Sequence, residues 1–383
     1  MFDVQIWMLD VKIGRKIKMP RSVMHDILEL GVNSRASDWH IKEGAPVTIR
    51  IDSRLVGTDM LATKDFIDKV AGIMLSTDEL KRRFSETGDA DLSFVEDNVG
   101  RFRVNIHRQR GAVSISMRHV KRNILSIEEL GIPLSVKRIA ESERGIIIVS
   151  GTTGSGKSTT LASMIEYINR NFRKHIITIE DPIEYEFQDS ESIIEQREIG
   201  LDTIDFAGAL KHVLRQDPDI IMVGEMRDKE SFDAALQASD TGHLVLTTLH
   251  ATNATQAVSR ILDFYERAEQ DAIRSALAIN IRSIMCQRLI RRAFGGGVIP
   301  GMEILLNTPI VKKLIEENRV EKLPAAVETG KEDGMQSFNQ SLLGLVNEGL
   351  ITEEDALKMA SNPESLKMNL KGIFLDSRSE IIG

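Results

Sequence analysis

A glycine-rich loop over residues 151–159 constrains the fold of this chain more than any other segment. It reads GTTGSGKST and fits the pattern G-x-x-x-x-G-K-[ST] of a phosphate-binding loop, or P-loop. In such a loop the glycines let backbone N–H groups turn toward phosphate oxygens, the lysine reaches the β- and γ-phosphates, and the serine hydroxyl binds Mg²⁺. We therefore predict that a nucleoside triphosphate is bound by Gly151, Thr152, Thr153, Gly154, Ser155, Gly156, Lys157, Ser158 and Thr159.

The sequence around this loop alternates between short apolar runs and amphipathic stretches. The apolar runs span residues 146–150, 176–179, 220–223 and 244–246. An apolar face with helical spacing begins at Leu161, so the loop is expected to open a helix whose N-terminus faces the phosphates. Strands without polar alternation, separated by helices, predict an α/β domain with a parallel sheet covered on both faces. The ligands of such a sheet gather at the carboxyl ends of its strands.

A different pattern precedes residue 145. Apolar and polar residues alternate over 101–106 and 113–118, which predicts half-buried antiparallel strands. With a helical stretch near 66–75 and a strand near 47–51, they form a small α+β domain. The predicted layout is an N-terminal extension over 1–22 that need not be ordered, the α+β domain over 23–120, a linker over 121–144, the nucleotide-binding domain over 145–305, and a helical C-terminal region over 306–383.

The composition describes a folded chain without membrane spans. Apolar residues make up 42% and charged residues 28%, and no run approaches 18 consecutive apolar residues. The first 21 residues hold no continuous apolar segment, so we expect no secretory signal and a cytoplasmic location. The single cysteine, Cys286, excludes an internal disulfide and a multi-cysteine zinc site. A formal net charge of −8 argues against a nucleic-acid partner.

Acidic side chains follow two of the predicted strands. Glu180 and Glu184 come after the second apolar run, and Glu225 comes after the third. A P-loop enzyme needs a carboxylate near its metal and another to activate the attacking water. Acidic strand ends also occur as solvated turns, but the upstream P-loop favours the catalytic interpretation. His250, at the end of the fourth run, is either a phosphate sensor or a hydrogen-bonded structural residue.

Three motifs after the P-loop resemble those of one superfamily. The stretches TIEDPIEY at 178–185, DPDIIMVGEMRD at 217–228 and TGHLVLTTLHA at 241–251 are similar to the Asp box, Walker B motif and His box of the secretion ATPases. From about Ser34 to about Leu375 the chain resembles the type IV pilus retraction ATPases, the PilT/PilU group. The resemblance implies a RecA-like P-loop NTPase core, a smaller PAS-like N-terminal domain and a helical C-terminal region. It also implies a homo-hexameric ring that hydrolyses ATP with Mg²⁺.

The resemblance further implies roles for residues that match the motifs. Glu184 is the candidate general base, and Glu180 is a second acidic candidate. Glu225 is the Walker B carboxylate, which holds Mg²⁺ together with Ser158, and His250 is the His-box sensor.

Arginines of the N-terminal domain help to close the nucleotide site in this family. Arg101, Arg103 and Arg118 are the matching candidates, because an arginine neutralises charge on a transferring phosphoryl group. The alternative, that these arginines are solvated charges on a strand face, stays open.

Two features bear on the subtype. About 150 residues precede the P-loop, fewer than in extension-type assembly ATPases, which often also carry a Cys₄ zinc site. Residues 309–317 read PIVKKLIEE where retraction motors read AIRNLIRE, so this part resembles the PilU branch. The resemblance implies a motor that powers or assists pilus retraction and twitching motility. Its implied partners are a paralogous retraction ATPase and an inner-membrane platform protein, through which it meets the membrane peripherally. The alternative is an ATP-binding accessory ring that supports a paralogous motor.

Overall fold

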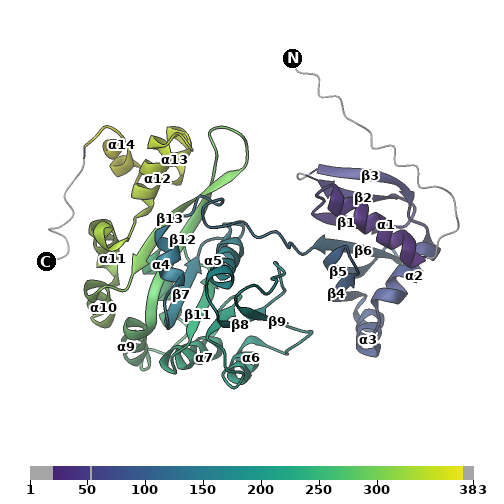
Figure 1. Cartoon of the computed structure of the whole chain (residues 1–383), viewed down its shortest axis with the longest axis horizontal. Helices are drawn as coiled ribbons and strands as arrows, with labels where there is room; N and C mark the ends of the chain where they lie inside the picture. The colour runs from purple at the N-terminus through teal and green to yellow at the C-terminus, as the bar shows by residue number, and fades with distance from the viewer. Residues whose placement is uncertain (1–19, 52–53, 374–383) are drawn as a thin grey trace, which may run out of the picture. The chain divides into compact units, whose positions relative to one another are not determined.

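The computed structural model describes residues 20–51 and 54–373 (Figure 1). The chain divides into two compact units, Met1–Lys121 and Arg122–Gly383. The predicted extension over 1–22 falls mainly on residues 1–19, which lie outside the described residues, and helix α1 begins at Pro20.

The first unit is built on an antiparallel sheet with the strand order β3-β2-β1-β6-β5-β4. Its elements are α1 (Pro20–Asn33), β1 (Asp38–Lys42), β2 (Pro46–Ile51), β3 (Arg54–Leu61), α2 (Lys64–Met74), α3 (Asp78–Thr87), β4 (Asp89–Glu96), β5 (Gly100–Gln109) and β6 (Ala112–His119). Strands β5 and β6 occupy the two segments with alternating polarity. Phe102 packs edge-to-face on Trp39 at 5.3 Å between ring centroids in the core, while Arg101 and Arg103 alternate out of it.

The second unit contains a seven-stranded sheet with the order β13-β12-β7-β11-β10-β8-β9. Its pairs are parallel except for the β12–β13 hairpin. The elements up to β13 are α4 (Ser135–Ala140), β7 (Gly145–Ser150), α5 (Lys157–Asn171), β8 (His175–Glu180), β9 (Ile193–Glu198), α6 (Phe206–Val213), β10 (Ile220–Val223), α7 (Lys229–Asp240), β11 (Leu244–Leu249), α8 (Ala254–Leu262), α9 (Gln270–Asn280), β12 (Ile281–Arg291) and β13 (Val298–Leu306). The predicted α/β architecture is confirmed.

Strand β7 shows why this sheet is covered on both faces. Its alternate side chains Ile146 and Ile148 belong to the apolar cluster that contains residues of α6, α7, α8 and α9. Ile147 and Val149 belong to the opposite cluster, with residues of α4 and α5. Each fully buried aliphatic side chain contributes about 1.5–3 kcal/mol, so an all-apolar strand is stable here only between two helical layers.

The structure differs from the linker expected over 121–144. The second unit begins at Arg122, and Ile127, Ile132 and Val136 are buried in the same cluster as α5. Most of this segment is therefore part of the second unit, because its apolar residues cover one face of the sheet.

Short helices follow β13, as predicted. They are α10 (Pro309–Glu316), α11 (Leu323–Thr329), α12 (Phe338–Asn347), α13 (Glu353–Met359) and α14 (Pro363–Leu370), with single 3₁₀ turns at Val320–Lys322 and Lys331–Asp333. Thr352 caps α13 by accepting from the N–H of Asp355 at 3.1 Å.

Helices α12 and α13 pack against the β12–β13 hairpin, and α14 packs against α12 and α13 (Figure 1). Arg288 of β12 donates to the carbonyl of Met359, and its guanidinium lies over the ring of Phe338, 4.1 Å from the centroid. No helix in the described part of the chain is both long and apolar enough to cross a bilayer.

Candidate nucleotide site

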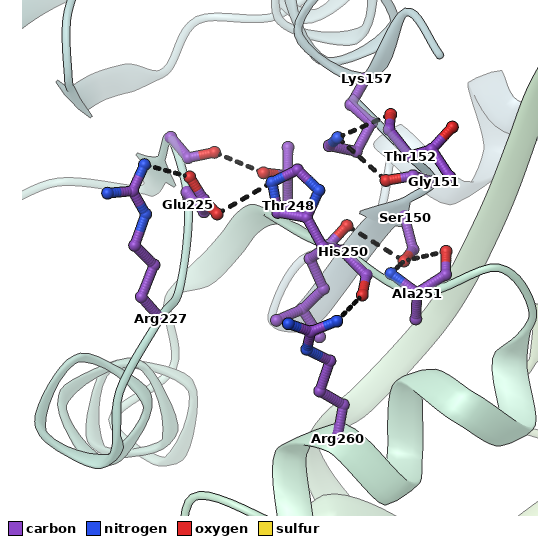
Figure 2. Close-up of polar contacts among 12 residues, drawn as sticks. Ser150, Gly151, Thr152, Lys157, Glu225, Arg227, Thr248, His250, Ala251 and Arg260 are labelled. Carbon is purple, nitrogen blue, oxygen red and sulfur yellow. Dashed lines mark hydrogen bonds and ion pairs between the residues drawn. The ribbon is translucent and has the colours of Figure 1, made fainter. Parts of the chain in front are cut away.

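The P-loop connects the carboxyl end of β7 to the first turn of α5. Gly156 adopts a φ of +88° immediately before the helix, a conformation that glycine takes without strain. The Nζ atom of Lys157 folds back on the loop and donates to the carbonyls of Gly151 at 3.0 Å and Thr152 at 3.3 Å (Figure 2). Burial lowers the pKa of Lys157, while Glu225 and Glu184 act in the opposite direction.

A cavity of about 350 Å³ lies beside this loop. It is lined by the P-loop residues Thr153, Gly154, Lys157 and Ser158, by the acidic residues Glu180, Asp181, Glu184 and Glu225, and by His250. Of the other predicted P-loop residues, Gly151, Thr152, Ser155, Gly156 and Thr159 do not line it. The structure thus brings the three candidate glutamates and the histidine to the face of the P-loop from three different strand ends.

Glu180 and Glu184 line the same cavity from different environments. Glu184 is exposed, whereas Glu180 is buried and accepts from Thr178 Oγ1 at 2.7 Å and Gln196 Nε2 at 3.0 Å. Burial raises the pKa of Glu180 to about 7, although the two hydrogen bonds act to lower it. An exposed carboxylate is accessible to a substrate water, and a buried carboxyl that titrates near neutrality exchanges a proton readily. The environments therefore favour different roles for the two residues.

Glu225 is held between two basic side chains. Its Oε1 lies 3.0 Å from His250 Nε2, and its Oε2 lies 2.7 Å from Arg227 Nη2 (Figure 2). The hydrogen bond to Glu225 raises the pKa of Arg227. Arg260 Nη1 donates to the carbonyl of His250 at 2.5 Å, and this bond fixes the chain at the end of β11. The strand ends of β10 and β11 are thus joined through side chains at the cavity.

Among the cavity residues that were not predicted, Arg227 and Tyr185 are bonded to predicted site residues. Arg227 follows Glu225 by two positions in a non-helical segment. This spacing was the signal in the sequence that Arg227 belongs to the same site as Glu225. The hydroxyl of Tyr185 lies 2.8 Å from Thr159 Oγ1 and links the segment after β8 to α5. A lone tyrosine beside an acidic motif carries no comparable signal in the sequence.

The donors around the P-loop suit Mg²⁺. The hydroxyl of Ser158 and the carboxylate of Glu225 line the same cavity and are oxygen ligands, which hard cations prefer. Residues 20–51 and 54–373 contain no cluster of three or more His, Cys, Asp or Glu side chains arranged for a metal. Mg²⁺ in a nucleotide site takes one or two protein ligands and completes its shell with phosphates and water, so these residues fit it.

The candidate arginines lie on strands β5 and β6 of the first unit. Arg118 Nε pairs with Asp38 Oδ1 at 2.7 Å, and Arg101 Nε donates to Ser93 Oγ at 2.7 Å. Arg103 lies directly opposite Arg118 in the β5–β6 register. The three arginines therefore share one region of the sheet, where Arg101 and Arg118 are bonded to neighbouring acceptors.

Comparison with known proteins agrees with this geometry. Residues 16–341 match the family described as type II/IV secretion system protein. The type IV pilus retraction ATPase PilT of Pseudomonas aeruginosa is 40% identical over 342 residues, which cover 89% of this chain and 98% of the relative. The type IV pilus ATPase PilU of the same organism is 40% identical over 347 residues, 90% of each chain.

A solved structure is similar over the same extent. The pilus retraction motor PilT with bound ADP matches with a TM-score of 0.82 and 39% identity, and the match covers 90% of this chain and 98% of that one. The fold class predicted from the sequence is confirmed. The chain belongs to the type II/IV secretion system protein family and is an ATPase of the branch that contains the type IV pilus retraction ATPases.

Proposed function

We propose that this ATPase powers or assists the retraction of type IV pili, and with it twitching motility. The observation that carries the proposal is the cavity in which Lys157, Ser158, Glu184 and Glu225 meet. Phosphoryl transfer to water needs a cation for the triphosphate, oxygen ligands for a metal and a carboxylate beside the water, and these four side chains supply each. The relatives named PilT and PilU support the proposal that the ATPase acts on a pilus.

ATP is proposed to bind with its phosphates over the P-loop and the N-terminus of α5. Lys157 Nζ exchanges its two neutral acceptors, the carbonyls of Gly151 and Thr152, for charged phosphate oxygens, and such bonds are stronger. Ser158 and Glu225 are the residues proposed to hold Mg²⁺. When bound, this ion neutralises charge on the β- and γ-phosphate oxygens.

In this proposal the two acidic residues after β8 have different roles in proton transfer. Glu184, which is exposed in the cavity, takes the proton of the attacking water. Glu180, with a pKa of about 7, is the second acidic candidate and is suited to receive or return a proton nearby. His250 senses the γ-phosphate through Glu225, from which it is 3.0 Å away.

The proposed assembly is a homo-hexamer at the cytoplasmic side of the inner membrane, attached through partners and not by insertion. Each turnover is proposed to rotate the units as rigid bodies. Arg101, Arg103 and Arg118 of the PAS-like unit are proposed to add positive charge at the γ-phosphate. The proposed partners are a paralogous retraction ATPase and the platform protein of the pilus machine, and nucleic acid is not a partner.

The enzymatic part of the proposal is tested by Lys157→Ala. The matched control is Lys211→Ala, which removes an exposed lysine of α6 that does not line the cavity. We expect K157A to lose ATP turnover at an unchanged unfolding temperature, because the loop loses its cation, while K211A keeps the wild-type rate. A K157A protein with full activity would refute the assignment of this site.

A second function is favoured by the sequence of helix α10. Its segment PIVKKLIEE departs from the retraction-motor pattern and carries the i,i+4 pairs Lys312–Glu316 at 3.9 Å and Lys313–Glu317 at 3.7 Å. An accessory ring that binds ATP and supports a paralogous motor would tolerate such a change.

The two functions are separated in cells by the variant Glu225→Gln. Retraction is scored in strains that carry wild-type protein, E225Q or a deletion, each with and without the paralogous ATPase. Loss of retraction in E225Q as complete as in the deletion supports the motor. Retraction that persists in E225Q at normal protein level, and fails in the deletion, supports the accessory ring.

A further inference from the structure

A buried amide on strand β12 is bonded to the P-loop. The side chain of Gln287 is buried, and its Nε2 donates to the carbonyl oxygen of Ser155 at 2.5 Å. Its Oε1 accepts from Thr160 Oγ1, in the first turn of α5, at 2.8 Å. Gln287 lies 132 positions after Ser155 in the sequence, so this contact is made by the fold and not by the motif.

Gln287 also lies close to two glycines of the P-loop, and at Gly151 it shares this position with the hydroxyl of Ser155. A Cβ atom on Gly151 would lie 2.7 Å from the backbone oxygen of Gln287, and one on Gly156 would lie 2.9 Å from its Nε2. Both distances are shorter than ordinary van der Waals contact. Gln287 therefore packs against the loop where it begins, and it contacts the loop again where the loop enters α5.

The bond to Ser155 fixes the direction of a peptide group. In a trans peptide the carbonyl of one residue and the N–H of the next point in opposite directions. Because the carbonyl of Ser155 points toward Gln287 inside the protein, the N–H of Gly156 points away from β12. Thr160 fixes the amide as well, since its hydroxyl donates to Oε1 and leaves Nε2 on the side of Ser155.

We propose that Gln287 is a positioning residue for the nucleotide phosphates. By holding the carbonyl of Ser155, it keeps the N–H of Gly156 directed at the phosphate position and preorganises the P-loop before nucleotide arrives. A preorganised loop loses less freedom on binding, and the gain is in affinity for the phosphates. This inference rests on the proposed nucleotide site and adds to it a residue from outside every motif.

The test compares Gln287→Met with a control variant. Methionine has a similar length and no amide, so Q287M leaves the Ser155 carbonyl without its donor. The control is Asn280→Leu, because Asn280 is also a buried amide with two side-chain partners, Ser239 Oγ at 2.7 Å and Asp240 Oδ1 at 2.8 Å. The backbone carbonyl of Asn280 lies beside Gly145, where β7 begins. The P-loop follows the opposite end of β7, so this variant does not touch the loop.

ADP affinity by calorimetric titration is the deciding measurement, with kcat and KM for ATP beside it. We expect Q287M to weaken ADP binding about threefold to tenfold, the fold-change of one hydrogen bond. KM should rise by a similar factor with kcat changed less, because the contact acts equally on bound ATP and the transition state. N280L should lower the unfolding temperature and leave the ADP affinity unchanged.

The outcomes separate the inference from the function on which it rests. Wild-type affinity in a folded Q287M protein overturns the positioning role, whereas wild-type protein that fails to bind ADP overturns the site itself. If Q287M does not fold, Thr160→Val decides, since it removes the donor that orients the amide, with Thr160→Ser as the variant that restores binding. T160V with wild-type ADP affinity then overturns the proposal.

Discussion

Replacing Glu180 by glutamine tests how burial controls an acidic residue of the nucleotide cavity. The folded protein raises the pKa of Glu180 from 4.5 to about 7, so it binds this proton more tightly than the unfolded chain does. As pH rises from about 4.5 to about 7, the unfolded chain releases its proton first, and the free energy of unfolding falls. The difference between the two pKa values corresponds to roughly 3 kcal/mol, lost in full above about pH 7.

The variant E180Q should not show this loss. Glutamine keeps an oxygen that accepts from Thr178 and Gln196, and it carries no charge at any pH. We expect E180Q and wild type to be similar near about pH 4.5, and E180Q to be more stable by up to roughly 3 kcal/mol near about pH 8. For a unit of this size, each kcal/mol moves the unfolding temperature by about 2–4 °C.

Thermal unfolding followed by circular dichroism across this pH range measures the difference. The matched control is Glu143→Gln before strand β7, since Glu143 is exposed and its neutralisation should leave the pH profile near that of wild type. Parallel profiles for wild type and E180Q would refute the reasoning, because they would mean that Glu180 is ionised in the folded protein at neutral pH. A profile that changes equally in E143Q would assign the effect to surface charge.

Three further predictions concern other parts of the second unit. Gly156→Ala should abolish measurable ADP binding in a titration, because φ is +88° and the new Cβ would meet Gln287; wild-type affinity would contradict this. Burial raises the pKa of the Cys286 thiol, so a thiol reagent should label the native protein only as fast as it unfolds, and rapid labelling would show an accessible sulfur. Ser337→Ala breaks a capping box with Gln340 and should cost about 1 kcal/mol in urea unfolding, whereas an unchanged midpoint would show that tertiary packing alone holds α12.

The parts of the site that the sequence predicted are those that short, contiguous stretches of sequence identify. Lys157 and Ser158 belong to a contiguous motif, and Glu225 and His250 each end a run of apolar residues. Because parallel strands end at the same edge of a sheet, locating the runs was enough to predict that these residues lie close together. In the structure these four residues line one cavity.

The parts that the sequence did not predict depend on packing between distant segments. Gln287 reaches the P-loop because β12 pairs with β7, and no periodicity in the sequence encodes that pairing. Its signal was a polar side chain inside an apolar run, which must find partners if buried. Residues 121–144 were predicted to form a linker, yet the apolar side chains of this segment, such as Ile127 and Ile139, cover one face of the sheet. The contrast between Glu180 and Glu184 comes from burial, which side-chain identity does not determine.

Gln287 and Arg288 are adjacent in β12, and their contacts affect how mutations in the C-terminal helices can be interpreted. Successive side chains of a strand leave on opposite sides, and here one contacts the P-loop while the other contacts Phe338 and the carbonyl of Met359. The residue that contacts the C-terminal helices is thus the direct neighbour in the sequence of the residue that contacts the P-loop. Mutations in α12 or α13 that abolish the function of this ATPase therefore cannot be assigned from their position alone to the C-terminal helices or to the nucleotide site. The turnover rate of each purified mutant protein sorts them.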